Sequence, residues 1–94
     1  MAEPTLDQLR ARIDRLDEIL VHTLAERFRQ TAKVGALKAR DTLPAFDPDR
    51  EARQRARIET LAKEAGLDPD FAQHIHGLIV DQVKDNHRKI SGEQ

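Results

Sequence analysis

The sequence predicts an all-α protein with one long N-terminal helix and two shorter helices. Apolar residues recur at spacings of three and four, and no segment shows the apolar–polar alternation of a strand. Gly and Pro lie mainly between these periodic segments, where they end helices. Because 94 residues leave little room for a second domain, we expect a single domain over residues 1–94.

The first helix is expected over about residues 5–40. Its apolar face is formed by Leu6, Leu9, Ile13, Leu16, Leu20, Leu24, Thr31, Val34 and Leu37. Such a helix is about 50 Å long, whereas a compact domain of this size has a radius of gyration of about 12 Å. Since two shorter helices cannot cover that face, we expect an interlocked homodimer. The alternative is a helix bent or broken near Gly35 in a monomeric bundle.

Residues 41–47 break the helical period and predict a loop. Asp47-Pro48 is typical of a helix start, with Asp as the N-cap and Pro in the first position. The second helix is therefore expected over about residues 48–65, with Gly66 as its C-terminal cap.

Asp68-Pro69 repeats the start signal and predicts a third helix over about residues 69–90. Its apolar face is formed by Phe71, Ile75, Leu78, Ile79, Val83 and Ile90. His87 lies on that face, where a lone histidine is more often a satisfied core residue than a functional one.

Composition excludes several classes of function. Sixteen Lys and Arg against seventeen Asp and Glu argue against a nucleic-acid partner. The chain has no Cys and no His pair at ligand spacing, so we expect neither a disulfide nor a metal site. No apolar run reaches the roughly 20 residues of a membrane span. The N-terminus lacks the basic and apolar regions of a secretory signal, so we expect a cytoplasmic protein without a membrane partner.

Two cations lie on the apolar face of the first helix. Arg27 continues the heptad that starts at Leu6, and Lys38 follows it by eleven residues. The two therefore point within about 20° of each other, some 16 Å apart along the axis. A cation facing a core is costly unless something negative meets it, so the pair could hold a small dianion. Alternatively, both side chains extend to water or pair with buried acids.

The sequence resembles the all-helical, type II chorismate mutases over about residues 5–90. The resemblance rests on Leu9-Arg10-x-x-Ile13-Asp14-x-Leu16-Asp17, Leu24-Ala25-Glu26-Arg27, Val34-Gly35-x-x-Lys38, Leu43-Pro44-x-x-Asp47-Pro48-x-Arg50-Glu51 and Gly66-Leu67-Asp68-Pro69-x-Phe71. The block from Lys38 to Glu51 is the most specific, because its fixed spacing crosses a loop and a helix start.

The resemblance implies an isomerase that rearranges chorismate to prephenate, without a cofactor, in Phe and Tyr biosynthesis. It also implies an interlocked homodimer with two active sites. In each site, Arg27 and the partner's Arg10 would hold the substrate carboxylates. Lys38 would contact a carboxylate and the ether oxygen, and Arg50 would support this cationic wall.

The acids and the third helix complete the implied site. Glu51 would accept a hydrogen bond from the substrate hydroxyl, and Asp47 would orient that region while capping its helix. The chain departs from the family at Phe46, where some members have Arg, and at Val83, where some have Ser. His87 replaces the usual Gln or Glu that donates to the ether oxygen.

Three alternative functions remain. Isochorismate pyruvate lyase and aminodeoxychorismate mutase share this fold, and the pair Asp47 and Glu51 favours the mutase over the lyase because it suits the chorismate hydroxyl. The third alternative is a helical dimerisation module without catalytic activity.

Overall fold

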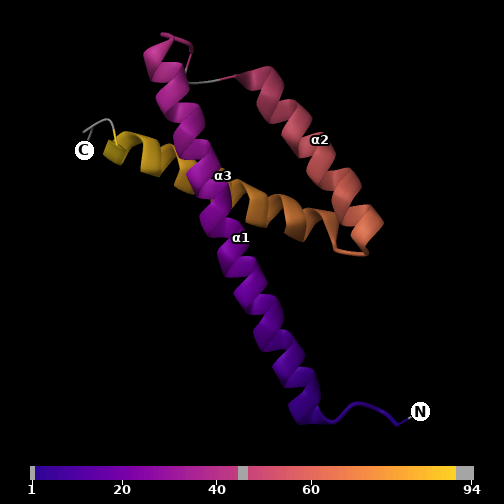
Figure 1. The fold of residues 1–94 in the computed structure, drawn as a ribbon. Coiled ribbons are helices and arrows are strands. Elements are labelled where there is room, and N and C mark those ends of the chain that lie inside the picture. The colour runs from indigo at the N-terminus through magenta and orange to yellow at the C-terminus, as the bar shows by residue number, and fades with distance from the viewer. Residues whose placement is uncertain (1, 45–46, 91–94) are drawn as a thin grey trace. The chain divides into compact units, whose positions relative to one another are not determined.

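A computed structural model describes residues 2–44 and 47–90 (Figure 1). The predicted all-α class is confirmed, because these residues form three helices and no strand. The helices are α1 (Leu6–Arg40), α2 (Pro48–Ala65) and α3 (Pro69–Ile90). α1 is a single helix that continues through Gly35. Phe46, one of the departures noted above, lies outside the described residues.

The chain divides between Thr31 and Ala32 into two compact units. The first unit contains the start of α1, which a capping box stabilises. Thr5 Oγ1 accepts a hydrogen bond from the Gln8 backbone N at 3.2 Å, and Gln8 Oε1 accepts one from the Thr5 backbone N at 2.9 Å. These two bonds satisfy backbone N–H groups that a helix start would otherwise leave unpaired.

The apolar face of α1 in the first unit is exposed. Leu6, Ile13 and Leu20 keep 61%, 55% and 56% of their surfaces accessible, and α1 has no buried residue. The periodic face read from the sequence is therefore present but uncovered in the described chain.

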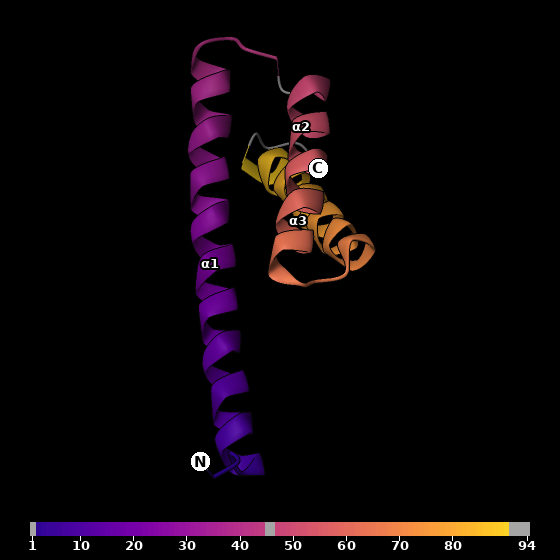
Figure 2. The ribbon, with the colours of Figure 1, turned by 90° about the vertical axis from the view of Figure 1, so that its right-hand side faces the viewer.

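The second unit contains a helical hairpin of α2 and α3, which Figures 1 and 2 show joined by a short turn. α2 starts as its sequence predicts, with the Arg50 backbone N donating to Asp47 Oδ1 at 3.1 Å. α2 ends at Gly66, whose φ of 75° suits a residue without a Cβ. The Leu67 backbone N donates to the Ala62 carbonyl at 2.8 Å and completes this cap.

Close packing between α2 and α3 depends on small and polar side chains. Ala62 and His76 are the buried residues of the described chain, at 3% and 9% exposure. Gln73 Nε2 also donates to the backbone carbonyl of Arg55 at 2.6 Å, which ties α3 to α2. This core is small for a chain of 94 residues.

α3 also contacts the last turns of α1 within the second unit, where the His87 ring packs on Gly35. A Cβ at position 35 would lie 2.9 Å from His87 Nε2 and 3.2 Å from both Cδ2 and Cε1. These distances are shorter than van der Waals contact, so only a glycine fits here while the ring keeps its place. Gly35 therefore makes room for the His87 ring at a position where Ala would suit the helix better.

We expect Gly35→Ala to fall short of the stabilisation of about 0.5–1 kcal/mol that Ala normally gives a helix interior, because the His87 ring must move to admit the new methyl group. In a His87→Ala background the same change should be neutral or stabilising by up to about 1 kcal/mol, because Ala favours helix. Urea denaturation of the four proteins measures this coupling.

Gly77→Ala is the matched control, because Gly77 lies inside α3 and, apart from the nearby backbone of that helix, no atom of the described residues lies within 4 Å of an added Cβ. It should stabilise the protein by about 0.5–1 kcal/mol in both backgrounds. If Gly35→Ala had the same effect with and without the His87 ring, the packing described here would be wrong.

Candidate functional site

The eight candidate site residues fall in both units. The first unit contains Arg10 and Arg27, both on α1. The second unit contains Lys38, Asp47, Arg50, Glu51, Val83 and His87. Arg10, Asp47 and Arg50 are exposed, and the other five are half-buried.

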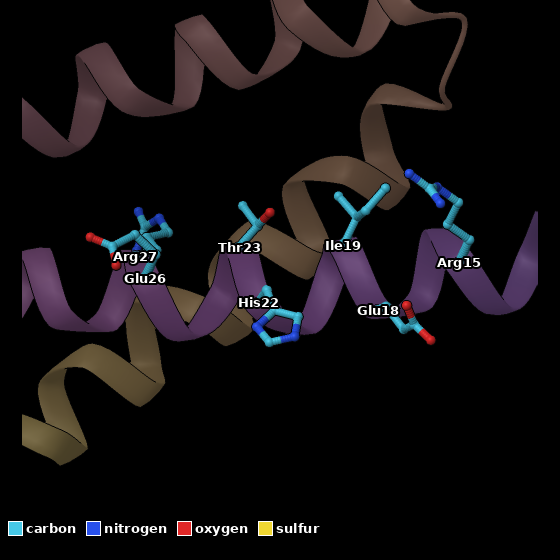
Figure 3. Close-up of a pocket in the computed structure, with 7 residues that line it drawn as sticks. All are labelled: Arg15, Glu18, Ile19, His22, Thr23, Glu26 and Arg27. Carbon is cyan, nitrogen blue, oxygen red and sulfur yellow. The ribbon is translucent and has the colours of Figure 1, made fainter.

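Arg27 lies at one end of an open hollow on α1 that begins near Arg15. Figure 3 shows Ile19 and Thr23 on the same side of the helix as Arg27. The Arg27 Nη1 atom is buried and has no hydrogen-bond partner among the described residues. A buried guanidinium nitrogen without an acceptor is unfavourable, so this position is suited to receive an anion.

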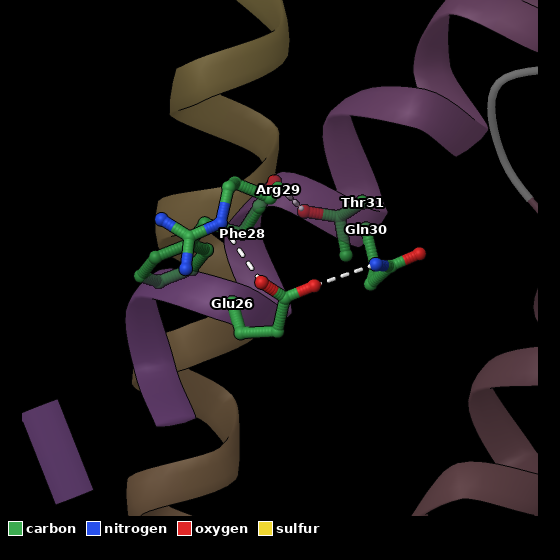
Figure 4. Close-up of polar contacts among 5 residues, drawn as sticks. All are labelled: Glu26, Phe28, Arg29, Gln30 and Thr31. Carbon is green, nitrogen blue, oxygen red and sulfur yellow. Dashed lines mark hydrogen bonds and ion pairs between the residues drawn. The ribbon is translucent and has the colours of Figure 1, made fainter. Parts of the chain in front are cut away.

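The neighbouring acid, Glu26, makes hydrogen bonds along the helix. Its Oε2 accepts from Arg29 Nε at 2.9 Å and its Oε1 accepts from Gln30 Nε2 at 2.7 Å (Figure 4). One turn further on, Thr31 Oγ1 donates to the Phe28 carbonyl at 3.1 Å. Each Glu26 oxygen thus has a neutralising or polar partner within the first unit.

In the second unit, the Gly35–His87 contact brings two candidate residues to one region. Lys38 is one turn beyond Gly35 on α1, so both residues lie on the same side of that helix. His87 reaches this side from α3, and Val83 precedes it by one turn. The contact therefore places the Lys38 side of α1 next to the His87 end of α3.

A second contact connects α3 with the start of α2. Lys84 Nζ lies 3.6 Å from Glu51 Oε1, and Lys84 is one turn before His87. Glu51 follows Arg50 in the first turn of α2, which the Asp47 cap orders. The two contacts together link the end of α1, the start of α2 and the C-terminal half of α3.

Sequence reasoning missed two members of this arrangement. The sequence marks Gly35 as a point where α1 could bend and as part of a family motif, but it does not indicate that Gly35 receives the His87 ring. Lys84 was not considered, although its spacing of three from His87 places both residues on one side of a helix. The spacing could have indicated that Lys84 lies near the site, whereas no local pattern in the sequence indicates that His87 contacts Gly35.

The charges of these residues are suited to bind an anion with a hydroxyl group. Four candidate residues are cations (Arg10, Arg27, Lys38 and Arg50), and two are acids. The described residues include no group of His, Asp and Glu that could hold a metal ion. None of the described helices is long and apolar enough to span a membrane.

Comparison with known proteins identifies relatives of this chain. The family model described as chorismate mutase type II matches residues 9–88. The T-protein of Enterobacter agglomerans is 37% identical over 70 residues, which cover 74% of this chain and 19% of that protein. The bifunctional chorismate mutase/prephenate dehydratase of Escherichia coli K12 is 36% identical over 80 residues, covering 85% and 21%.

A third relative, the 4-amino-4-deoxychorismate mutase of Streptomyces pristinaespiralis, is 30% identical over 82 residues, covering 87% of this chain and 64% of that protein. The chain thus spans about a fifth of the first two relatives and under two thirds of the third. Because the family match extends from the first turns of α1 to the last turn of α3, the chain belongs to the chorismate mutase type II family.

Proposed function

We propose that this chain is a chorismate mutase, an isomerase that rearranges chorismate to prephenate in Phe and Tyr biosynthesis. Family membership supports the activity, and the buried Arg27 Nη1 without a partner is the observation that supports the site. The proposal keeps the single domain and the cytoplasmic location expected from the sequence.

The reaction suits a site made of charged side chains. It is a pericyclic rearrangement that needs no nucleophile, general acid, general base or cofactor. Its rate therefore depends on holding the folded conformer and on stabilising the negative charge that develops on the breaking ether oxygen. Fixed cations and hydrogen-bond donors supply both effects.

Four cations would bind the substrate carboxylates and the ether oxygen. Arg27 would hold one carboxylate together with the partner's Arg10. Lys38 would contact a carboxylate and donate to the ether oxygen, and Arg50 would add positive charge from the first turn of α2. Charge-assisted hydrogen bonds of this kind are stronger than neutral ones, which suits a dianionic substrate.

His87 would give the ether oxygen a second donor, since even the neutral imidazole keeps one N–H. The Nε2 end of its ring packs on Gly35, so this donation requires Nδ1 or a rotation of the side chain. Val83, one turn away, would contribute an apolar contact where some relatives have Ser.

Glu51 would accept a hydrogen bond from the substrate hydroxyl, with Asp47 ordering the first turn of α2 that carries it. A substrate with an amino group in place of the hydroxyl is the second candidate, because 4-amino-4-deoxychorismate mutases are among the relatives. A carboxylate can accept a hydrogen bond from either group.

We also propose that the active form is an interlocked homodimer. The exposed apolar face of α1 and the small core around Ala62 and His76 support a second copy as cover. The partner's Arg10 would then complete each site.

The wild-type protein should convert chorismate to prephenate, measured by separate assays of prephenate and pyruvate. Arg27→Met should lower kcat/KM at least roughly tenfold, because charge-assisted bonds of about 1.5–3 kcal/mol are lost. Its free energy of unfolding should stay level or rise, because an unpaired buried nitrogen is removed.

Arg29→Met is the matched control on the same helix, because Arg29 is exposed and forms an ion pair with Glu26 at 2.9 Å. It should keep kcat/KM within about twofold, as expected for a surface ion pair.

If the wild-type protein formed pyruvate from isochorismate and no prephenate from chorismate, the chain would instead be an isochorismate pyruvate lyase.

Subunit mixing tests whether the sites are shared. Arg10→Ala and Lys38→Ala should each be nearly inactive alone, because each removes a cation from both sites. Unfolding and refolding them together should restore about a quarter of wild-type activity, because each mixed dimer regains one intact site. Light scattering should give twice the chain mass, and mixtures that stay inactive would contradict a shared site.

A further inference from the structure

The ion pair between α2 and α3 involves the acid proposed to meet the substrate hydroxyl. Lys84 Nζ lies 3.6 Å from Glu51 Oε1, and the two side chains are 52% and 28% exposed. The pair connects helices that are packed together within the second unit. A positive charge is therefore held beside the Glu51 carboxylate.

The neighbouring acid on α3 has cationic partners of its own. Asp85 accepts from Arg88 Nη2 at 3.4 Å and lies 3.2 Å from Lys89 Nζ. These contacts, with Lys89 first, lower the pKa of the Asp85 carboxyl below its usual value. Lys84 differs from these two cations because it reaches across to α2 rather than along its own helix.

We propose that Lys84 makes the site prefer a substrate with a neutral hydroxyl over one with an ammonium group at the same position. This inference rests on the proposed function, in which Glu51 contacts that substituent. A hydroxyl donates one hydrogen bond to the carboxylate and carries no net charge for Lys84 to repel. The Lys84 cation therefore leaves this contact largely intact.

An ammonium group would meet a different balance of charges. An amino group on a saturated carbon is mostly protonated near neutral pH, so the amino analogue would bring a cation to Glu51. Glu51 would attract it, but Lys84, a few ångströms away, would repel it and compete for the same carboxylate. Without Lys84, Glu51 would favour the ammonium group.

The pair contributes little to folding by comparison. Lys84 itself is exposed and Glu51 is half-buried, and a pair that solvent still reaches has a small effect on stability, so replacing Lys84 should leave the helices folded. The measurement that identifies the proposed role is the ratio of kcat/KM for chorismate to kcat/KM for the amino analogue. A loss of folded protein lowers both values equally and leaves this ratio unchanged.

The experiment compares kcat/KM for chorismate and for 4-amino-4-deoxychorismate at low ionic strength. For Lys84→Met, we expect the ratio of chorismate to amino-analogue activity to fall roughly five- to tenfold. Lys84→Arg keeps the positive charge and should keep the ratio within about twofold of wild type.

Lys63→Met is the control, because Lys63 Nζ forms an ion pair of similar length with Glu59 Oε1, at 3.4 Å, on the surface of α2. It should leave the ratio unchanged. An unchanged ratio in Lys84→Met, an equal fall in the Lys63 variant, or a wild type that prefers the amino analogue would overturn the inference. A wild type that converts neither substrate would refute the proposed function and this inference with it.

Discussion

The uncovered apolar face of α1 is the constraint on which the rest of the protein depends. A helix with this many exposed leucines and isoleucines tends to associate in water, and the core around Ala62 and His76 is too small to offset that tendency. In the proposed dimer, a second copy would cover this face and would also contribute Arg10. Folding and catalysis would then depend on the same association.

Arg27 illustrates how the proposed chemistry opposes stability. Its buried Nη1 has no acceptor among the described residues, which is unfavourable in the free protein. A bound carboxylate would supply the acceptor. The free energy needed to bury and orient the guanidinium is then spent during folding, so it does not add to the barrier of the reaction. Natural proteins commonly accept reduced stability at functional positions for this reason.

Local signals predicted the helices well, because capping depends on neighbouring residues. Asp47 and Gly66 cap α2 as their residue types and positions indicated. The contacts of Gly35 with His87 and of Glu51 with Lys84 join residues far apart in sequence, and periodicity does not show which helix faces meet. The roles of the site residues came from family resemblance, and they remain predictions.

The packing of the His87 ring on Gly35 also affects how this protein can evolve. While the ring is present, a larger residue at position 35 meets a steric barrier, although it would suit the helix better. Once position 87 carries a smaller or more flexible side chain, that barrier disappears and position 35 becomes free to vary. The two positions are therefore coupled, and the order in which they change affects the stability of the intermediate sequence.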